Sequence, residues 1–206
     1  MADFTCLSRF RLAACLLIAL SQCHRECDLE KTLNDLPSDL FGIYNRFLEP
    51  VAPQHWVYIE AIFRWLVFSV TPITLDELAD AVAFDFSNPA KYVYRPDMRK
   101  DNTRAIPRWL EGLVVVKDDV GGESSVALAH ASVQDYVLSE QFMAKCDLSD
   151  GLSHTFIART CVHYLSIFPI TRSIPKHIQT IRCHCMPQKI GSTIYSIAMT
   201  GPHYQP

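Results

Sequence analysis

Residues 71–78 carry the strongest local structural signal in the sequence, Thr-Pro-Ile-Thr-Leu-Asp-Glu-Leu. Thr74 and Glu77 have the spacing of a capping box, in which each side chain hydrogen-bonds the backbone of the other residue at the start of a helix. Pro72 prevents a preceding helix from running on through this point. The sequence therefore predicts that a new helix begins at Thr74, with an apolar stripe of Leu75, Leu78, Ala79 and Val82.

Four helical segments are predicted before this point, at residues 10–20, 29–34, 37–48 and 55–69. The third has apolar residues at i, i+3, i+4, i+7 and i+8 from Leu40, which is the pattern of a helix with one buried face. The fourth has very few polar side chains, so we expect it to lie at the centre of the fold.

The residues after the capped helix are interpreted as a loop at 85–100, because Pro89 and Pro96 interrupt a polar stretch, and then as a short helix at 101–110. Two short runs rich in β-branched residues, 113–117 and 125–129, flank Gly121-Gly122 and predict a β-hairpin.

A helix opened by Ser132 and extending past Phe142 is expected next, followed by a helix at 152–167. Beyond Phe168 the apolar periodicity fails, and five prolines appear.

Helices followed by a two-stranded hairpin are the components of a winged helix. The predicted fold class is mainly α with a small β-hairpin, and the expected organisation has four parts. These are a helical segment at 1–50, a winged-helix domain at 51–145, a helical connector at 146–168 and an irregular or disordered basic tail at 169–206.

The charge distribution bears on the class of partner. The 206 residues carry a formal net charge of −3, but all 22 Asp and Glu residues lie before residue 151. Asp76, Glu77, Asp80 and Asp85 crowd the capped helix, and Arg104 and Arg108 are the only cations near the next predicted helix. A DNA-binding winged helix needs cations on its recognition helix, so we expect no nucleic-acid partner. No apolar run approaches the roughly 20 residues that span a bilayer, so no membrane partner is expected either.

The N-terminus and the eight cysteines leave an alternative open. Arg9 and Arg11 precede an apolar run at 12–20, and Ala19-x-Ser21 has the form of a signal-peptide cleavage site. Asp3 and the absence of Asn-x-Ser/Thr motifs favour a cytoplasmic protein with free thiols instead. The cysteines lack the paired short spacings of a structural zinc site, and no metal is expected.

Several segments resemble one family, the fungal NACHT-type STAND proteins, which are NOD-like signalling ATPases. They resemble the helical segment and the winged-helix domain that follow the ATPase core in that family, a pattern that GPI inositol-deacylase-like proteins also have. The matching segments are Phe10–Cys15, Leu33–Pro37, Ile43–Arg46, Trp65–Ser69, Pro72–Ala79 and Leu128–Leu138.

The resemblance implies a role for His130. With Ser132 and Gln134 it has the His-x-Ser-x-Gln setting of a histidine that contacts the ADP phosphate in the family's closed state. The alternative is that His130 caps or packs at the junction between hairpin and helix. We favour this alternative for the chain alone, because it lacks the Gly-x4-Gly-Lys-Ser/Thr loop that cradles phosphates.

The sequence offers no catalytic arrangement. His130, Ser132 and Asp135 are too close along the chain to form a hydrolase triad, and there is no Gly-x-Ser-x-Gly motif. We therefore expect a non-enzyme without a cofactor: a cytoplasmic regulatory or interaction module, a piece of a NACHT-type protein, whose partner is an ATPase domain or a repeat-containing protein. The alternatives are a secreted cysteine-containing protein with a signal peptide, and a nucleic-acid-binding winged helix.

Overall fold

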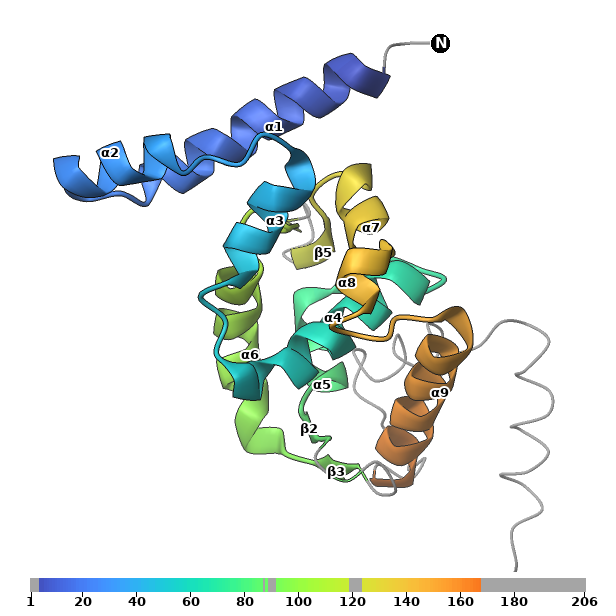
Figure 1. Ribbon diagram of the computed structural model, residues 1–206. Helices are drawn as coiled ribbons and strands as arrows, with labels where there is room; N and C mark the ends of the chain where they lie inside the picture. The colour runs from blue at the N-terminus through green and yellow to red at the C-terminus, as the bar shows by residue number, and fades with distance from the viewer. Residues whose placement is uncertain (1–3, 87, 89–91, 119–123, 168–206) are drawn as a thin grey trace, which may run out of the picture.

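Helix α4 (Trp56–Phe68) lies at the centre of the computed structural model, which describes residues 4–86, 88, 92–118 and 124–167 (Figure 1). Five of its side chains are buried: Ile59, Ala61, Ile62, Phe63 and Trp65. The central position predicted for this helix is confirmed, and its almost uninterrupted apolar sequence is the reason, because a helix without a polar face has to be covered on several sides.

The described part of the chain is mainly helical, as predicted, with other helices before and after α4. Their bounds are α1 (Phe4–Ser21), α2 (Glu26–Asn34), α3 (Leu40–Leu48), α5 (Leu75–Ala81), α6 (Pro96–Trp109), α7 (Ala131–Val137), α8 (Glu140–Met143) and α9 (Asp150–Ile167). A single 3-10 turn, η1 (Pro53–His55), leads into α4. Helices α1 and α2 project from the body, and we call this pair the arm (Figure 1).

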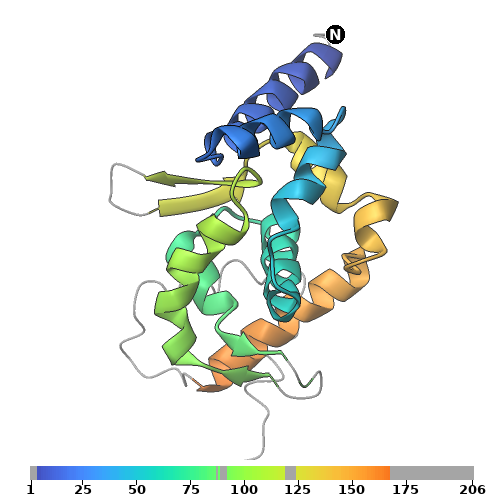
Figure 2. The ribbon, with the colours of Figure 1, turned by 60° about the vertical axis from the view of Figure 1, so that its left-hand side comes forward.

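A three-stranded antiparallel sheet contains the predicted hairpin, which Figure 2 shows projecting from the body. Its strands are β1 (Ile73–Thr74), β4 (Val114–Asp118) and β5 (Ser124–Leu128), in the order β1-β5-β4. Val126 lies opposite Ile73 on one side and Val116 on the other. The glycine pair expected in the hairpin turn, Gly121 and Gly122, lies outside the described residues, as does the predicted tail at 169–206.

The capping box at the start of α5 is confirmed. The backbone amide of Glu77 donates to Thr74 Oγ1 over 3.2 Å, and the amide of Thr74 donates to Glu77 Oε2 over 2.9 Å. Because this cap satisfies two amides that the helix itself leaves unpaired, it fixes the direction in which the chain leaves β1.

The prediction of a loop at 85–100 is wrong. Strands β2 (Phe84–Asp85) and β3 (Val93–Tyr94) pair antiparallel, and α6 begins at Pro96 instead of near residue 101. Pro96 opens the helix, where its missing N–H is not needed. Pro96, interpreted from the sequence as a loop signal, is therefore a helix start, and Pro107 lies in the last turn of the same helix.

The single helix predicted after the hairpin is two helices. His130, not Ser132, is the N-cap of α7, and Phe142 lies on α8. Ser139 separates the two, since its hydroxyl donates to the carbonyl of Tyr136 over 2.6 Å and accepts from the amide of Phe142 over 3.4 Å. One side chain thus ends α7 and caps α8.

One cluster of buried side chains runs from Cys15 on α1 to Tyr164 on α9. Tyr44 of α3 and Tyr136 of α7 are fully buried within it, with ring centroids 5.4 Å apart. The core therefore continues across residues 50 and 145, where the sequence predicts boundaries between parts of the chain. The division into those parts stays a prediction.

We predict that Trp65→Ala lowers the free energy of unfolding by about 3–5 kcal/mol, because it empties the space of a large core side chain. Trp65 is 1% exposed. Trp65→Phe should cost much less, since the buried indole Nε1 has no hydrogen-bond partner among the described residues and its loss leaves no group unsatisfied. Urea denaturation followed by circular dichroism measures both. Val162→Ala on α9, where Val162 is 50% exposed, is the control; equal losses for Val162→Ala and Trp65→Ala would contradict the assigned core.

Candidate functional site

His130 lies between β5 and α7, and its side chain caps the helix. Its Nδ1 accepts a hydrogen bond of 3.1 Å from the backbone amide of Ser132 and lies 2.7 Å from Ser132 Oγ. A backbone N–H only donates, so Nδ1 acts here as the acceptor and the neutral ring carries its proton on Nε2. The cap explains a histidine at this position without a ligand, as expected for the chain alone. A contact with nucleotide, expected from the resemblance, stays a prediction.

The cap is the end of a chain of polar contacts that reaches the arm. Ser132 Oγ is buried and lies 2.9 Å from the hydroxyl of Tyr44 on α3. Arg11 of α1 donates from Nε to the same hydroxyl over 3.4 Å, and from a terminal nitrogen to the carbonyl of Gly112. The contacts join α7, α3, α1 and the turn between α6 and β4.

Gly112 is required in that turn for two reasons. Its φ is +78°, a conformation that side chains with a Cβ rarely adopt. A Cβ at this position would also lie 2.5 Å from Cε2 of Phe47 on α3, well inside van der Waals contact. We call the site formed by Arg11, Tyr44, Phe47, Gly112 and the His130 cap the junction.

A cleft of about 680 Å³ lies where the arm, the end of α3 and the end of α6 meet. Its wall carries both signs of charge, with Arg46 and Arg108 opposed by Glu49 and Glu111. Arg46 is already engaged, because it donates to the carbonyl of Asp35 over 3.1 Å and to Thr32 Oγ1 over 3.4 Å. The mixed and partly satisfied charges favour no single class of ionic ligand.

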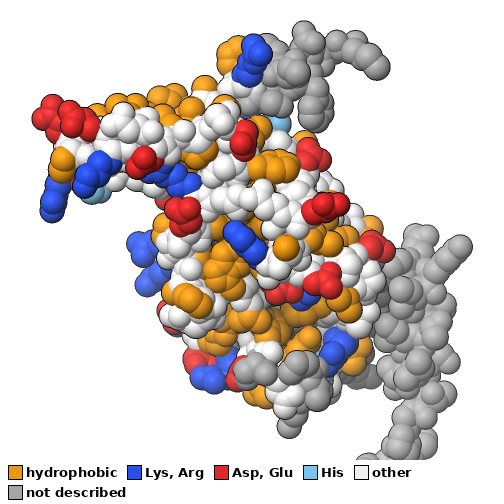
Figure 3. Space-filling model, in the orientation of Figure 1, with side chains coloured by type: hydrophobic (Ala, Val, Ile, Leu, Met, Phe, Trp, Pro, Cys, Tyr) orange, Lys and Arg blue, Asp and Glu red, His pale blue; other side chains and the backbone are white. Residues whose placement is uncertain are grey.

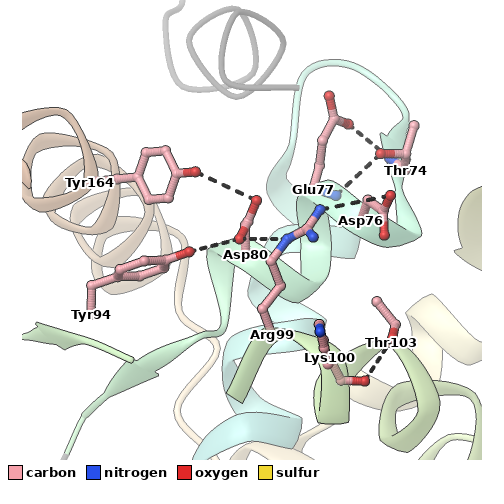
Figure 4. Close-up of polar contacts among 9 residues, drawn as sticks. All are labelled: Thr74, Asp76, Glu77, Asp80, Tyr94, Arg99, Lys100, Thr103 and Tyr164. Atoms are coloured by element: carbon pink, nitrogen blue, oxygen red, sulfur yellow. Dashed lines mark hydrogen bonds and ion pairs between the residues drawn. The ribbon is translucent and has the colours of Figure 1, made fainter. Parts of the chain in front are cut away.

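Asp80 forms a second polar cluster, shown in Figure 4, in a position that the sequence did not predict. It is one of the acids that crowd the capped helix in the sequence, but its side chain is 1% exposed. The Nε of Arg99 lies 2.9 Å from its Oδ1 as an ion pair, and Tyr94 donates to the same oxygen over 2.9 Å. Tyr164 of α9 donates to Oδ2 over 3.5 Å. The cluster thus fastens α5 to α6, β3 and α9.

The surroundings of Asp80 are those of a structural ion pair. Burial, and then the charge of Asp80, raise the pKa of both Tyr94 and Tyr164, so both phenols stay protonated as donors at neutral pH. Glu77 is likewise buried, in the capping box. Two of the four acids that argue against a nucleic-acid partner therefore lie in the interior.

No group of three His, Cys, Asp or Glu side chains with the arrangement of a metal site occurs within the described residues. Cys15, Cys23, Cys27 and Cys146 are free thiols, and burial raises the pKa of Cys146 to about 11. None of the helices in the described ranges is both long and apolar enough to cross a bilayer.

Comparison with known proteins finds a distant relative. The chain is 31% identical over 144 residues to the azaphilone pigments biosynthesis cluster protein L of Monascus ruber. The match covers 66% of this chain and 30% of the relative, so the chain spans about a third of that protein's length. No family model matches the chain, and no solved structure matches it either.

We predict that Arg99→Met destabilises the protein by about 3–5 kcal/mol, because it leaves the carboxylate of Asp80 buried without its counter-ion. Adding Asp80→Asn in the same chain should restore part of the loss, since the amide carries no charge. The exposed pair of Arg95 and Asp97 supplies the control: Arg95→Met should leave the urea midpoint nearly unchanged. A double variant as unstable as Arg99→Met alone would argue against a buried charge pair.

Proposed function

We propose that this chain is a non-catalytic regulatory module of a NACHT-type signalling ATPase, with a helical segment and a winged helix that pack against a nucleotide-binding domain in the cytoplasm. Its partner is that ATPase domain or a repeat-containing protein. The chain spans only about a third of the relative that it matches. The name of that relative assigns it to a pigment biosynthesis cluster and names no activity.

The observation that carries the proposal is the order of elements around the sheet. Helix α4, strand β1, helix α5, the paired strands β2 and β3, helix α6, and strands β4 and β5 follow each other along the chain, and β5 pairs with both β1 and β4. A winged helix has a succession of helix, strand, two helices and hairpin, with its first strand added to the hairpin; here the β2–β3 pair is inserted between the two helices. This order agrees with the segments of the sequence that resemble the family.

The position of His130 supports the regulatory part of the proposal. It directly follows the hairpin, and the helix cap occupies Nδ1. The remaining ring nitrogen, Nε2, carries the proton of the neutral ring and is a donor of the kind that a phosphate oxygen accepts. A nucleotide held by a neighbouring ATPase domain would meet this donor with the histidine already oriented by Ser132.

The test combines the chain with a nucleotide-binding domain. We predict that the chain alone binds neither ATP nor ADP by calorimetry, because no loop supplies the phosphate-directed amides and lysine. Mixed with a fungal NACHT nucleotide-binding domain, it should slow the release of ADP from that domain, and His130→Ala should abolish the effect. His154→Ala, at an exposed position of α9, is the matched control. Micromolar ADP binding by the chain alone, or equal ADP release with and without it, would contradict the proposal.

One feature favours a second candidate, binding of duplex nucleic acid by α6. Because α6 begins at Pro96, it carries Lys100 as well as Arg104 and Arg108. These three exposed residues, spaced i, i+4 and i+8, lie along one face of the helix. Asp97 and Asp101 on the same helix oppose the three cations, which is why we rank this candidate second. Binding to a 20-base-pair duplex that weakens with salt, and that Lys100→Glu with Arg104→Glu removes, would favour it over the first.

A further inference from the structure

The outward side of α1 presents an apolar stripe to solvent. Phe10 is 71% and Leu17 67% exposed, and Ala13 and Ala14 between them are also exposed. We call these four residues the outer stripe. Figure 3 shows hydrophobic side chains along the upper edge of the arm, and Figure 1 shows no described element lying over this side of α1.

The opposite side of the same helix is packed against the body. Cys15 and Ala19 are buried, and Leu12 and Leu16 lie against the core. Arg11 is the one charged residue between Phe10 and Ser21, and its guanidinium donates hydrogen bonds to the Tyr44 hydroxyl and the Gly112 carbonyl. A helix that is apolar all round is normally covered all round, so the outer stripe is the half of α1 that the described part of the chain leaves without a partner.

The outer stripe is symmetric in size about its midpoint. Along the helix it reads large, small, small, large: Phe10, Ala13, Ala14 and Leu17. If a second copy lay antiparallel across it, Phe10 of each copy would oppose Leu17 of the other, and the alanines would oppose each other at the two-fold axis. Small residues at the centre let two helix axes approach to about 8 Å, the short end of the usual range.

The charges of the arm favour the same antiparallel arrangement. Arg9 is exposed at one end of the outer stripe, and α2 begins beyond the other end with Glu26 and Asp28. Figure 3 shows acidic side chains at the far tip of the arm and a basic one at its opposite end. Antiparallel pairing brings the basic end of one copy toward the acidic end of the other. Arg25 and Lys31 reduce this acidity without cancelling it, because Glu30 adds a third carboxylate.

We propose that the outer stripe of α1 is a self-association surface, at which two copies of this chain pair through antiparallel α1 helices. One helix pair buries less than the ~800 Å² per partner of a standard interface, so the dimer depends on protein concentration. A membrane surface fits less well, since a helix lying in the interface needs a solvated polar face, and the inner face of α1 is packed on protein. The proposal is independent of the nucleotide test above.

Sedimentation equilibrium of the chain between about 5 μM and 500 μM is the first test. We expect a monomer–dimer equilibrium whose dissociation constant rises at least tenfold in Leu17→Glu. Leu152→Glu on α9, a residue 51% exposed, should leave the constant unchanged. Circular dichroism should show all three proteins folded, since both leucines are exposed. A monomer at every concentration, or equal effects of the two substitutions, would overturn the proposal.

Crosslinking tests the geometry, in a chain where Cys23→Ser and Cys27→Ser remove the free thiols of the arm's tip. Ala14→Cys should form a disulfide-linked dimer, because two copies of residue 14 are offset by only about 1.5 Å along the axis. Ser21→Cys should not, since its two copies lie about 22 Å apart, far beyond the ~7 Å that a disulfide spans. Equal crosslinking at both positions would overturn the antiparallel register. Binding to phosphatidylserine vesicles that Leu17→Glu abolishes, in a chain that stays monomeric, would assign the stripe to membranes instead.

Discussion

The hydrogen bond from Arg11 to the carbonyl of Gly112 joins the first helix of the chain to the turn that starts the hairpin, 101 residues later. Gly112 holds its carbonyl in place through a positive φ that few other residues adopt. The ring of Phe47 lies so close to its Cα that no side chain fits there. Arm, α3, α6 and hairpin therefore meet at one residue whose backbone conformation has few alternatives.

Around this point the polar contacts form a continuous path. Tyr44 accepts from Arg11 and contacts Ser132, and Ser132 in turn holds the imidazole of His130. Buried hydrogen-bonded groups of this kind are costly to break singly, because each partner left behind is unsatisfied. The orientation of His130 thus depends on residues of α1 and α3, which links the histidine of the proposed nucleotide contact to the packing of the arm.

The elements that the sequence predicted well are those set by neighbouring residues. The capping box of Thr74 and Glu77, the apolar helix α4 and the β-branched strands of the hairpin all have local causes. The errors have local causes too: Pro96 was interpreted as a loop residue although it starts α6, and Ser139 divides one predicted helix into two. The same residue type gives opposite signals at different positions in a helix, so the pattern alone left both interpretations open.

The candidate site was predictable only in part. His130 was found through the family resemblance, and its role as a cap was the interpretation favoured for the chain alone. Its supporting partners were not found, since Tyr44 and Ser132 are 88 residues apart and no local pattern relates them. The burial of Asp80 was missed for the same reason: its neutralising partner Arg99 lies on another helix, so a helix rich in acids looked like a solvated surface.

Hydrogen exchange of the Gly112→Ala variant, read by mass spectrometry, tests most directly whether the junction holds these elements together. Alanine strains the turn and pushes against Phe47, so protection should fall together in peptides from α1, α3 and α7 as well as in β4. Gly151→Ala, at a glycine whose Cβ would meet open space, should leave the pattern unchanged. Loss of protection confined to the turn and β4, with α1, α3 and α7 as slow as in the unaltered chain, would contradict the account.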